Sequence, residues 1–296
     1  MKKIITYVLI FAATSLLLFS ICALFPKGPE TVWFITAAAD GTNTITIAKE
    51  GKPFLFGSQN INVYANGKML LKTTLANGGK ILYESNYLIE WIDNQHVILV
   101  LKGEKQRNEC IAIRFETSDA EYEITNASPF ESNDVQLDGI GLLIGKSISF
   151  SLLDSILGPP SHTKRSDGTG TFYLEFREYE DIQFMFHLNN NDDMHGYCAG
   201  MVSKNEEICF IKDIVAGDDM TKVLSRFPME NCIMTADLQY GEIKLLYGET
   251  SYMNSGGFIV YEENMPAEVR YTDAHTLLVF YLDSNRIVTD IFINHD

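Results

Sequence analysis

The sequence has few cations for its length, and this lack limits what the protein can bind. Its 296 residues include 23 Lys and Arg against 39 Asp and Glu, which gives a formal net charge of -16 at pH 7. An acidic surface repels the phosphate groups of nucleic acids and of anionic lipids. We therefore expect no nucleic-acid partner and no charge-driven adhesion to lipid.

Cysteine is also scarce, with five residues at positions 22, 110, 198, 209 and 232. These are too few and too widely spaced for a dense disulfide framework. The stretch CAGMVSKNEEIC predicts two strands about a turn, with the sulfurs of Cys198 and Cys209 facing each other across the ladder. Two states of this pair stay open, a disulfide and two free thiols that act as small hydrophobic side chains.

Motifs for catalysis and cofactor binding are missing. The sequence contains no Gly-x-Ser-x-Gly nucleophile motif. Gly145-Lys146-Ser147 lacks the first glycine of a phosphate-binding loop and is more typical of a helix start. Glu178 and Glu180 flank a turn and do not resemble a glycosidase pair. We expect no cofactor, and the sequence does not indicate an enzyme.

One short region does contain the residue types that bind metals. His187, Asp192 and His195 lie close together, and Cys198 and Cys209 follow. Imidazole, carboxylate and thiolate are ligands for zinc. However, residues 189–193 are also strong turn sequence. A metal site and a solvated hairpin tip are therefore both open interpretations.

Charge is absent from residues 4–25, which are apolar or uncharged throughout and follow Lys2 and Lys3. As a helix this segment would be about 33 Å long, enough to cross a hydrocarbon layer about 30 Å thick. It predicts a transmembrane anchor over residues 1–26 with the remainder outside the cytoplasm. A cleaved export signal and a lipid-modified Cys22 are alternatives with the same localisation.

Beyond the anchor, the pattern predicts an α+β, β-rich protein. Alternating apolar residues and the Asn66-Gly67 turn predict an antiparallel β-meander domain over 27–117. Residues 118–136 are polar, include Pro129 and predict a linker. Two tandem repeats, 137–210 and 211–296, each begin with a short amphipathic helix that is followed by strands of an antiparallel sheet.

Aromatic residues gather near glycines in the second repeat. Tyr247, Tyr252, Phe258 and Tyr261 surround Gly248, Gly256 and Gly257. Exposed aromatic side chains on a sheet often contact a protein partner, and this is one interpretation. Alternating core aromatics are the other.

Two resemblances add expectations. Phe25-Pro26-Lys27-Gly28, the DGTNTITI stretch at 40–47 and Glu90-Trp91-Ile92-Asp93-Asn94 resemble Gram-positive single-pass membrane proteins with a small extracytoplasmic β domain of unknown function. The element order over 137–296 resembles the β-lactamase inhibitor protein-like module. The first resemblance implies a location and a fold, and the second implies an inhibitor or immunity-type protein.

Together these features favour a membrane-anchored, extracytoplasmic binding protein of the bacterial envelope that binds a protein partner without catalysis. The alternatives are an envelope hydrolase or zinc-dependent enzyme that uses the region from His187 to Cys209, and an inhibitor or immunity-type protein.

Overall fold

The computed structural model describes residues 29–51, 57–104, 106–116, 119–125, 127–166, 172–189, 194–230, 232–250 and 254–296. The chain divides into two compact units. The first ends at Leu82 and also includes Gly103–Gln106, and the second comprises Tyr83–Lys102 and Arg107–Asp296. The predicted anchor over 1–26 lies outside the described residues. Within the described ranges, no helix has the length and apolar character needed to cross a membrane.

The first unit is built on one antiparallel sheet in the order β1-β2-β3-β4. Asn66 and Gly67 make the tight turn between β3 and β4, and both have positive φ, 49° and 78°. The side chains of Ile45 and Ile47 are completely buried, as expected for alternate positions on one sheet face. The strands are Glu30–Ala37 (β1), Thr44–Glu50 (β2), Gln59–Ala65 (β3) and Lys68–Leu75 (β4).

The second unit contains a four-stranded sheet, a two-stranded sheet and one sheet of eleven strands. The four-stranded sheet has the order β5-β6-β7-β8, with Tyr87–Trp91 (β5), His96–Leu101 (β6), Glu109–Phe115 (β7) and Ala120–Thr125 (β8). The two-stranded sheet pairs Gln136–Leu137 (β9) with Gly141–Leu142 (β10). Short 3-10 helices span Glu84–Asn86 and Ser132–Asp134.

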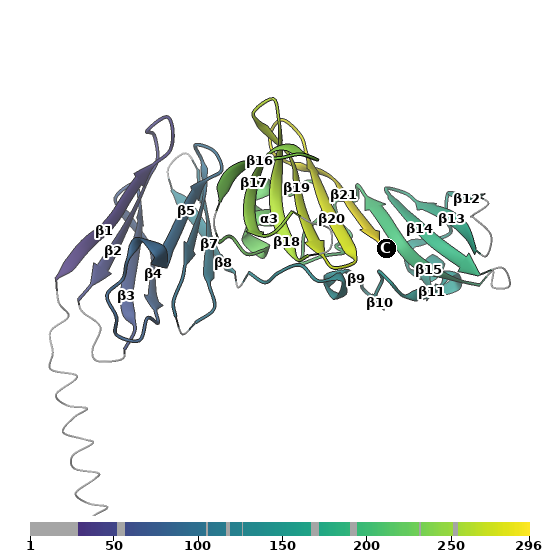
Figure 1. Ribbon diagram of the computed structural model, residues 1–296, viewed down its shortest axis with the longest axis horizontal. Helices are drawn as coiled ribbons and strands as arrows, with labels where there is room; N and C mark the ends of the chain where they lie inside the picture. Colours follow the sequence, from purple (N-terminus) through teal and green to yellow (C-terminus); the bar gives the residue numbers. More distant parts are fainter. Residues whose placement is uncertain are drawn as a thin grey trace, which may run out of the picture. The chain divides into compact units, whose positions relative to one another are not determined.

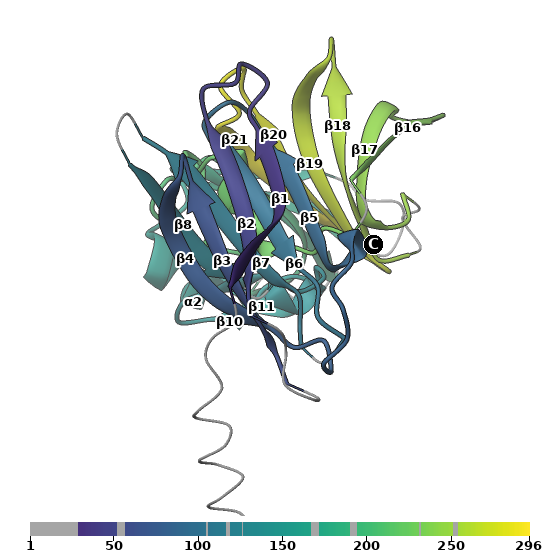
Figure 2. The ribbon, with the colours of Figure 1, turned by 90° about the vertical axis from the view of Figure 1, so that its left-hand side faces the viewer.

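The eleven-stranded sheet, here called the large sheet, is antiparallel and runs in the order β12-β13-β14-β15-β21-β20-β19-β18-β17-β16, while β11 pairs with part of β15 (Figure 1). Figure 2 shows β16 to β19 side by side at one end of it. Its first strands are Ser147–Ser149 (β11), His162–Ser166 (β12), Phe172–Tyr179 (β13), Ile182–Asn189 (β14) and His195–Ser203 (β15). Its remaining strands are Ile233–Asp237 (β16), Gly241–Gly248 (β17), Gly256–Glu262 (β18), Met265–Asp273 (β19), Thr276–Leu282 (β20) and Val288–His295 (β21).

Two short α-helices, Phe150–Leu157 (α2) and Met220–Arg226 (α3), contribute to the main core. The Asp219 carboxylate caps α3 by accepting a hydrogen bond from the Lys222 backbone N–H at 3.0 Å. Gly158 follows α2 with φ of 82°. Phe227, directly after α3, stacks on Tyr271 with ring centroids 3.8 Å apart. Apolar side chains of the large sheet and of both helices therefore share one core.

The predicted α+β class with two separate helix-plus-sheet repeats is wrong, although the β-rich character is confirmed. The described residues contain 21 strands and only two short α-helices. The strands that follow α2 and those that follow α3 belong to one sheet, because β15 pairs with β21 from Gly200 and Asn294 to Ser203 and Ile291. A strand with a free edge exposes unpaired backbone groups, and this pairing satisfies the edges of both strands.

The boundaries along the chain also differ from those expected. The segment 27–117 contributes β1–β4 to the first unit and β5–β7 to the second. Part of the expected linker 118–136 is strand β8, which pairs with β7 along its whole length. Its sequence AEYEIT alternates charged and apolar residues, a strand pattern that the surrounding polar residues obscured.

The close approach of β15 and β21 makes a testable prediction. A Cβ atom at Gly200 would lie 2.7 Å from the backbone oxygen of Ile293, so Gly200→Ala should force the two strands apart. We expect it to lower the free energy of unfolding by about 2 kcal/mol, as measured by denaturant titration. Ser284→Ala, in an exposed turn, is the control. Equal stability of the Gly200→Ala variant and the wild type would contradict this packing.

Candidate interaction surface

One face of the large sheet packs into the core, and the opposite face does not. Along β14, Phe184, Phe186 and Leu188 point into the core, so Met185 and His187 point to the opposite face. Strand register then assigns the residues of this second face, which we call the open face. Its apolar and aromatic residues are Leu174, Phe176, Met185, His187, Tyr197, Val202, Leu277, Val279, Tyr281 and Phe292. The same register also places polar and charged residues on this face, which include Lys164, Glu178, Gln183, Glu268, Arg270, Asp290 and Asn294.

Apolar side chains of the open face lie among polar ones, and several of these apolar side chains are in contact with solvent. Tyr197 and Tyr281 are 38% and 37% exposed, and Phe292 and Leu277 are half-buried. The outer positions of a solvated sheet are usually polar. Here, the outer positions of β20 are Leu277, which is half-buried, Val279, which is buried, and Tyr281, which is exposed. The arrangement suits contact with another apolar surface.

A pocket of about 390 Å³ lies at one end of this face, along the edge where β20 begins and β21 ends. Leu277 and Phe292 of the open face contribute to its lining, and Thr276, with His275, adds polar atoms. The Oγ1 atom of Thr276 lies 2.8 Å from His295 Nδ1. The pocket combines apolar side chains with hydrogen-bonding groups, as ligand-binding pockets commonly do.

Four rings form a row beside this pocket. His187, Tyr197, His295 and His275 follow one another with ring centroids 6.3, 6.3 and 6.4 Å apart. They come from β14, β15, β21 and the turn before β20, so the row crosses adjacent strands. The chain brings together histidines that are separated by more than 80 residues of sequence.

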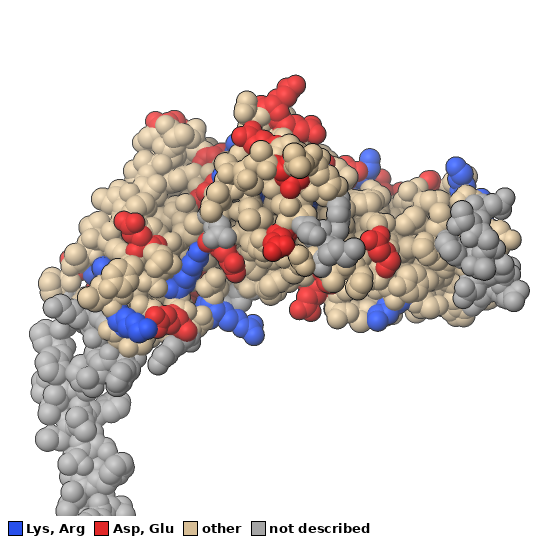
Figure 3. All heavy atoms as spheres, in the orientation of Figure 1, with Lys and Arg blue, Asp and Glu red and all other residues tan. Residues whose placement is uncertain are grey.

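Charges of both signs lie on and around the open face. Arg270 pairs with Glu268 and Lys204 with Asp290, while Lys164 is exposed on β12 opposite Phe176. At the turns that end β18 and β20, a second pocket of about 310 Å³ is lined by acidic residues and apolar neighbours. Figure 3 shows acidic side chains gathered at this end of the sheet. The acidic residues of this pocket are Glu262, Glu263 and Asp283.

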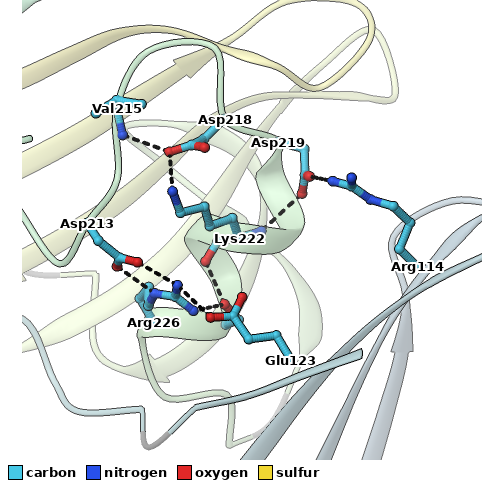
Figure 4. Close-up of polar contacts among 9 residues, drawn as sticks. Arg114, Glu123, Asp213, Val215, Asp218, Asp219, Lys222 and Arg226 are labelled. Atoms are coloured by element: carbon cyan, nitrogen blue, oxygen red, sulfur yellow. Dashed lines mark hydrogen bonds and ion pairs between the residues drawn. The ribbon is translucent and has the colours of Figure 1, made fainter. Parts of the chain in front are cut away.

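A third pocket, of about 260 Å³, lies where β7 and β8 meet the start of α3. Several of its charged groups form ion pairs (Figure 4). Arg114 pairs with Asp219, and Lys222 Nζ lies 2.8 Å from the Asp218 carboxylate. The Asp218 carboxylate also accepts a hydrogen bond from the Val215 backbone N–H.

The neighbouring Arg226 bridges two acids, with nitrogen–oxygen distances of 2.8 Å to Asp213 and 2.9 Å to Glu123. Its hydrogen bonds hold the pKa of Asp213 below the usual range, although burial opposes this. Thr125 adds a hydrogen bond to the backbone oxygen of Ser225. These contacts run from the four-stranded sheet to α3, so this pocket is mainly part of the attachment between them.

The residues predicted for a metal site do not come together. His187 points to the open face, whereas Cys198 is buried on the core face beside Phe186. His195 is exposed on β15, Cys209 is exposed beyond the end of β15, and Asp192 lies outside the described residues. Within the described part of the chain, no group of three or more His, Cys, Asp or Glu residues could hold a metal ion.

Cys198 and Cys209 are both free thiols in the structure. The expected hairpin between them does not form, because β15 ends at Ser203 and pairs with β14, β11 and β21 instead. Burial raises the pKa of Cys198 to about 12, so this thiol stays protonated at neutral pH.

Of the two interpretations of the aromatic residues near the glycines, burial supports a place in the core for Tyr247 and Phe258. Tyr247 and Phe258 are buried, at 5% and 0% exposure. The Tyr247 hydroxyl accepts a hydrogen bond from the Phe130 backbone N–H at 3.2 Å. Tyr261 is half-buried and packs against the main core, and Tyr252 lies outside the described residues. The exposed aromatics Tyr197 and Tyr281 lie on other strands, and sequence reasoning missed them.

Asp93 offers a test of the polar contacts near the third pocket. Its carboxylate accepts hydrogen bonds from the backbone N–H groups of Gln95 and His96, and it lies 3.0 Å from His96 Nδ1 and 3.2 Å from Arg286. Burial opposes ionisation, but the contacts with His96 and the hydrogen bond from Gln95 hold the pKa of Asp93 at about 2, below the ordinary 3.8. Its contribution to stability is therefore present above about pH 4 and is lost as the pH falls towards 2.

We expect Asp93→Asn to lower the free energy of unfolding at pH 7 by about 1 kcal/mol, allowing for solvent screening. The loss should shrink as the pH falls from 4 towards 2, as measured by denaturant titration at several pH values. Asp138→Asn, at an exposed carboxylate, is the control. A loss of equal size at every pH would contradict the assigned pKa.

Sequence comparison adds no relative from which a function could be transferred. No known protein family matches the chain, and no curated protein matches it significantly.

Proposed function

We propose that this protein is a non-catalytic binding protein that presents the open face of its large sheet to a protein ligand. The observation that carries the proposal is the set of apolar and aromatic side chains on a face that is partly accessible to solvent. Partly exposed Tyr197, Tyr281 and Phe292 lie on neighbouring strands of that face. Contiguous apolar patches on folded proteins commonly mark sites of protein association.

The side chains of this face are suited to recognition. Tyrosine provides a large contact area and a hydroxyl group, and aromatic residues are enriched at the centres of interfaces. The strands beneath them are hydrogen-bonded on both sides, which holds the side chains in place before binding. A rigid surface loses little conformational entropy when a ligand docks.

Charge narrows the kind of partner. Glu268, Asp290 and the acidic turns surround apolar residues, in a chain whose formal net charge is -16. A partner with an apolar patch bordered by basic side chains would complement this surface. Two copies of the acidic chain would repel each other, so a different protein suits the face better than a second copy.

The proposed location outside the cytoplasm rests on the sequence of residues 4–25, which lie beyond the described ranges. The segment follows Lys2 and Lys3 and is interpreted as a retained anchor, a cleaved signal or the site of a lipid-modified Cys22. Each of these interpretations places the rest of the chain outside the cytoplasm. The partner is accordingly proposed to be a protein of the bacterial envelope or a secreted protein.

Site-specific photo-crosslinking in intact cells tests the proposal. A photoreactive amino acid at Tyr197 or Tyr281 should give crosslinks to the same protein partner. The same amino acid at Ser155, exposed on α2, should not capture it. Crosslinks from Ser155 that match those from the open face, or none from either tyrosine, would contradict the proposal.

Substitution provides a quantitative prediction once the crosslinked partner is purified. Tyr281→Ala should weaken its binding about 30-fold, the effect of losing an interface residue worth about 2 kcal/mol. Thr289 lies on the adjacent strand β21 and is exposed, so Thr289→Ala is the matched control with unchanged affinity. The affinities are measured by calorimetry. Equal affinity of the two variants for the partner would show that the partner does not contact Tyr281.

A further inference from the structure

The two parts of the large sheet are joined by a short seam. We use this term for the pairing of β15 with β21, which comprises four residue pairs between Gly200–Ser203 and Ile291–Asn294. On the other side of β15, the pairing with β14 is longer. Beyond Gly200, the earlier part of β15 pairs with β11 instead of β21. Few backbone hydrogen bonds therefore connect the two parts.

His295 lies directly at the end of this seam and is confined on several sides. Its Nδ1 atom is 2.8 Å from Thr276 Oγ1, and its ring faces Tyr197 across the seam at 6.3 Å. Gly145 lies so close that an added Cβ atom would be 2.9 Å from His295 Nε2. A larger residue at position 145 would not fit beside this ring.

The charged and titratable groups near His295 come from each neighbouring element. His275 lies in the turn before β20, with ring centroids 6.4 Å apart, and Asp273 ends β19. Lys146 belongs to the segment before β11, and Asp296 follows His295 in the chain. Burial first, and then His275 and Lys146, lower the pKa of His295, while Asp273 and Asp296 act in the opposite direction.

We propose that protonation of His295 loosens the seam, so that the large sheet opens locally between β15 and β21 at mildly acidic pH. A proton on His295 would have to be held in a confined position beside His275. When the seam opens locally, the His295 ring is no longer confined and no longer lies close to His275. His295 therefore binds the proton more strongly in the opened form than in the closed form. The seam is therefore most stable at neutral pH. The free energy needed to open it falls as the pH drops below 6.5, the ordinary pKa of histidine.

The seam also matters for the surface of the sheet. Val202 on β15 and Phe292 on β21 are paired across it, and both belong to the open face. Opening the seam would separate the part of the open face that holds Met185 and Tyr197 from the part that holds Leu277 and Tyr281. This consequence does not require the proposed function, because the loosening is a property of the isolated chain.

Amide hydrogen exchange on the full-length chain, purified in detergent, tests the inference. After correction for intrinsic rates, the amides of residues 200–203 and 291–294 should exchange at least about threefold faster near pH 5 than near pH 7, the factor expected from two unit charges 6.4 Å apart in water. His295→Gln should remove this difference, because glutamine does not titrate and can still bond to Thr276. His162→Gln, exposed on β12, should leave it unchanged.

The inference would be overturned if the corrected exchange rates of these amides were the same at pH 5 and pH 7 in the wild type. It would also be overturned if the His295→Gln variant kept the full difference between the two pH values. If His295→Gln does not fold, His275→Gln provides a second test, since removing this neighbour should reduce the response. An NMR titration of the His295 ring gives an independent measurement. A pKa at or above the ordinary value for histidine would also overturn the inference.

Discussion

The architecture of the second unit depends on the backbone pairing of β15 with β21. Four residue pairs turn two runs of strands, distant in sequence, into one large sheet. Without them, β15 and β21 would each present an unpaired edge, which favours aggregation. The pairing also extends the main core across both runs, so that Phe184 and Phe186 belong to the same cluster as Tyr271 and Phe280.

The same pairing makes the opposite face continuous. Side chains alternate along each strand, so every residue that fixes the core on one side places its neighbour on the open face. Phe292 lies between buried Ile291 and Ile293, and Leu277 precedes buried Leu278. The apolar surface that we propose for binding is thus held by the packing of the core beneath it. The polar pocket beside α3 has a different character, because its cations Arg114 and Lys222 are paired with carboxylates.

Local patterns were informative where a few adjacent residues determine the structure. The Asn66-Gly67 turn, the end of α2 at Gly158 and the alternation in β14 all follow from short-range chemistry. The helix start expected at Gly145-Lys146-Ser147 was wrong, because Ser147–Ser149 is strand β11 and α2 begins at Phe150. The joining of the repeats was not predictable in this way, because no local signal in GMVS or IFIN specifies which distant strand will pair. The segment of β8 was predicted to be a linker because it contains the charged residues Glu121 and Glu123, although both lie on a paired strand.

The candidate site was predictable only in part for the same reason. The sequence left open whether Tyr247 and Phe258 form a partner surface or part of the core, and their glycine neighbours reflect close packing in the interior. A Cβ atom at Gly257 would lie 2.5 Å from the Tyr247 ring, so this glycine makes room for a core aromatic. His187 and Cys198 are near in sequence but point to opposite faces, which no spacing rule revealed without the register of β14 and β15. The row of His187, Tyr197, His295 and His275 likewise exists only after the sheet has formed.

The most direct test of this account is a crosslink across the pairing on which it depends. Val202 and Phe292 are opposite each other on β15 and β21, so cysteines at both positions, with Cys209→Ser to remove an exposed thiol, should form a disulfide on mild oxidation. Cysteines at Leu174 and Phe292, which lie on non-adjacent strands of the same face, should not. Mass spectrometry that finds the first crosslink and not the second supports a single continuous sheet. Two free thiols at positions 202 and 292 would contradict it.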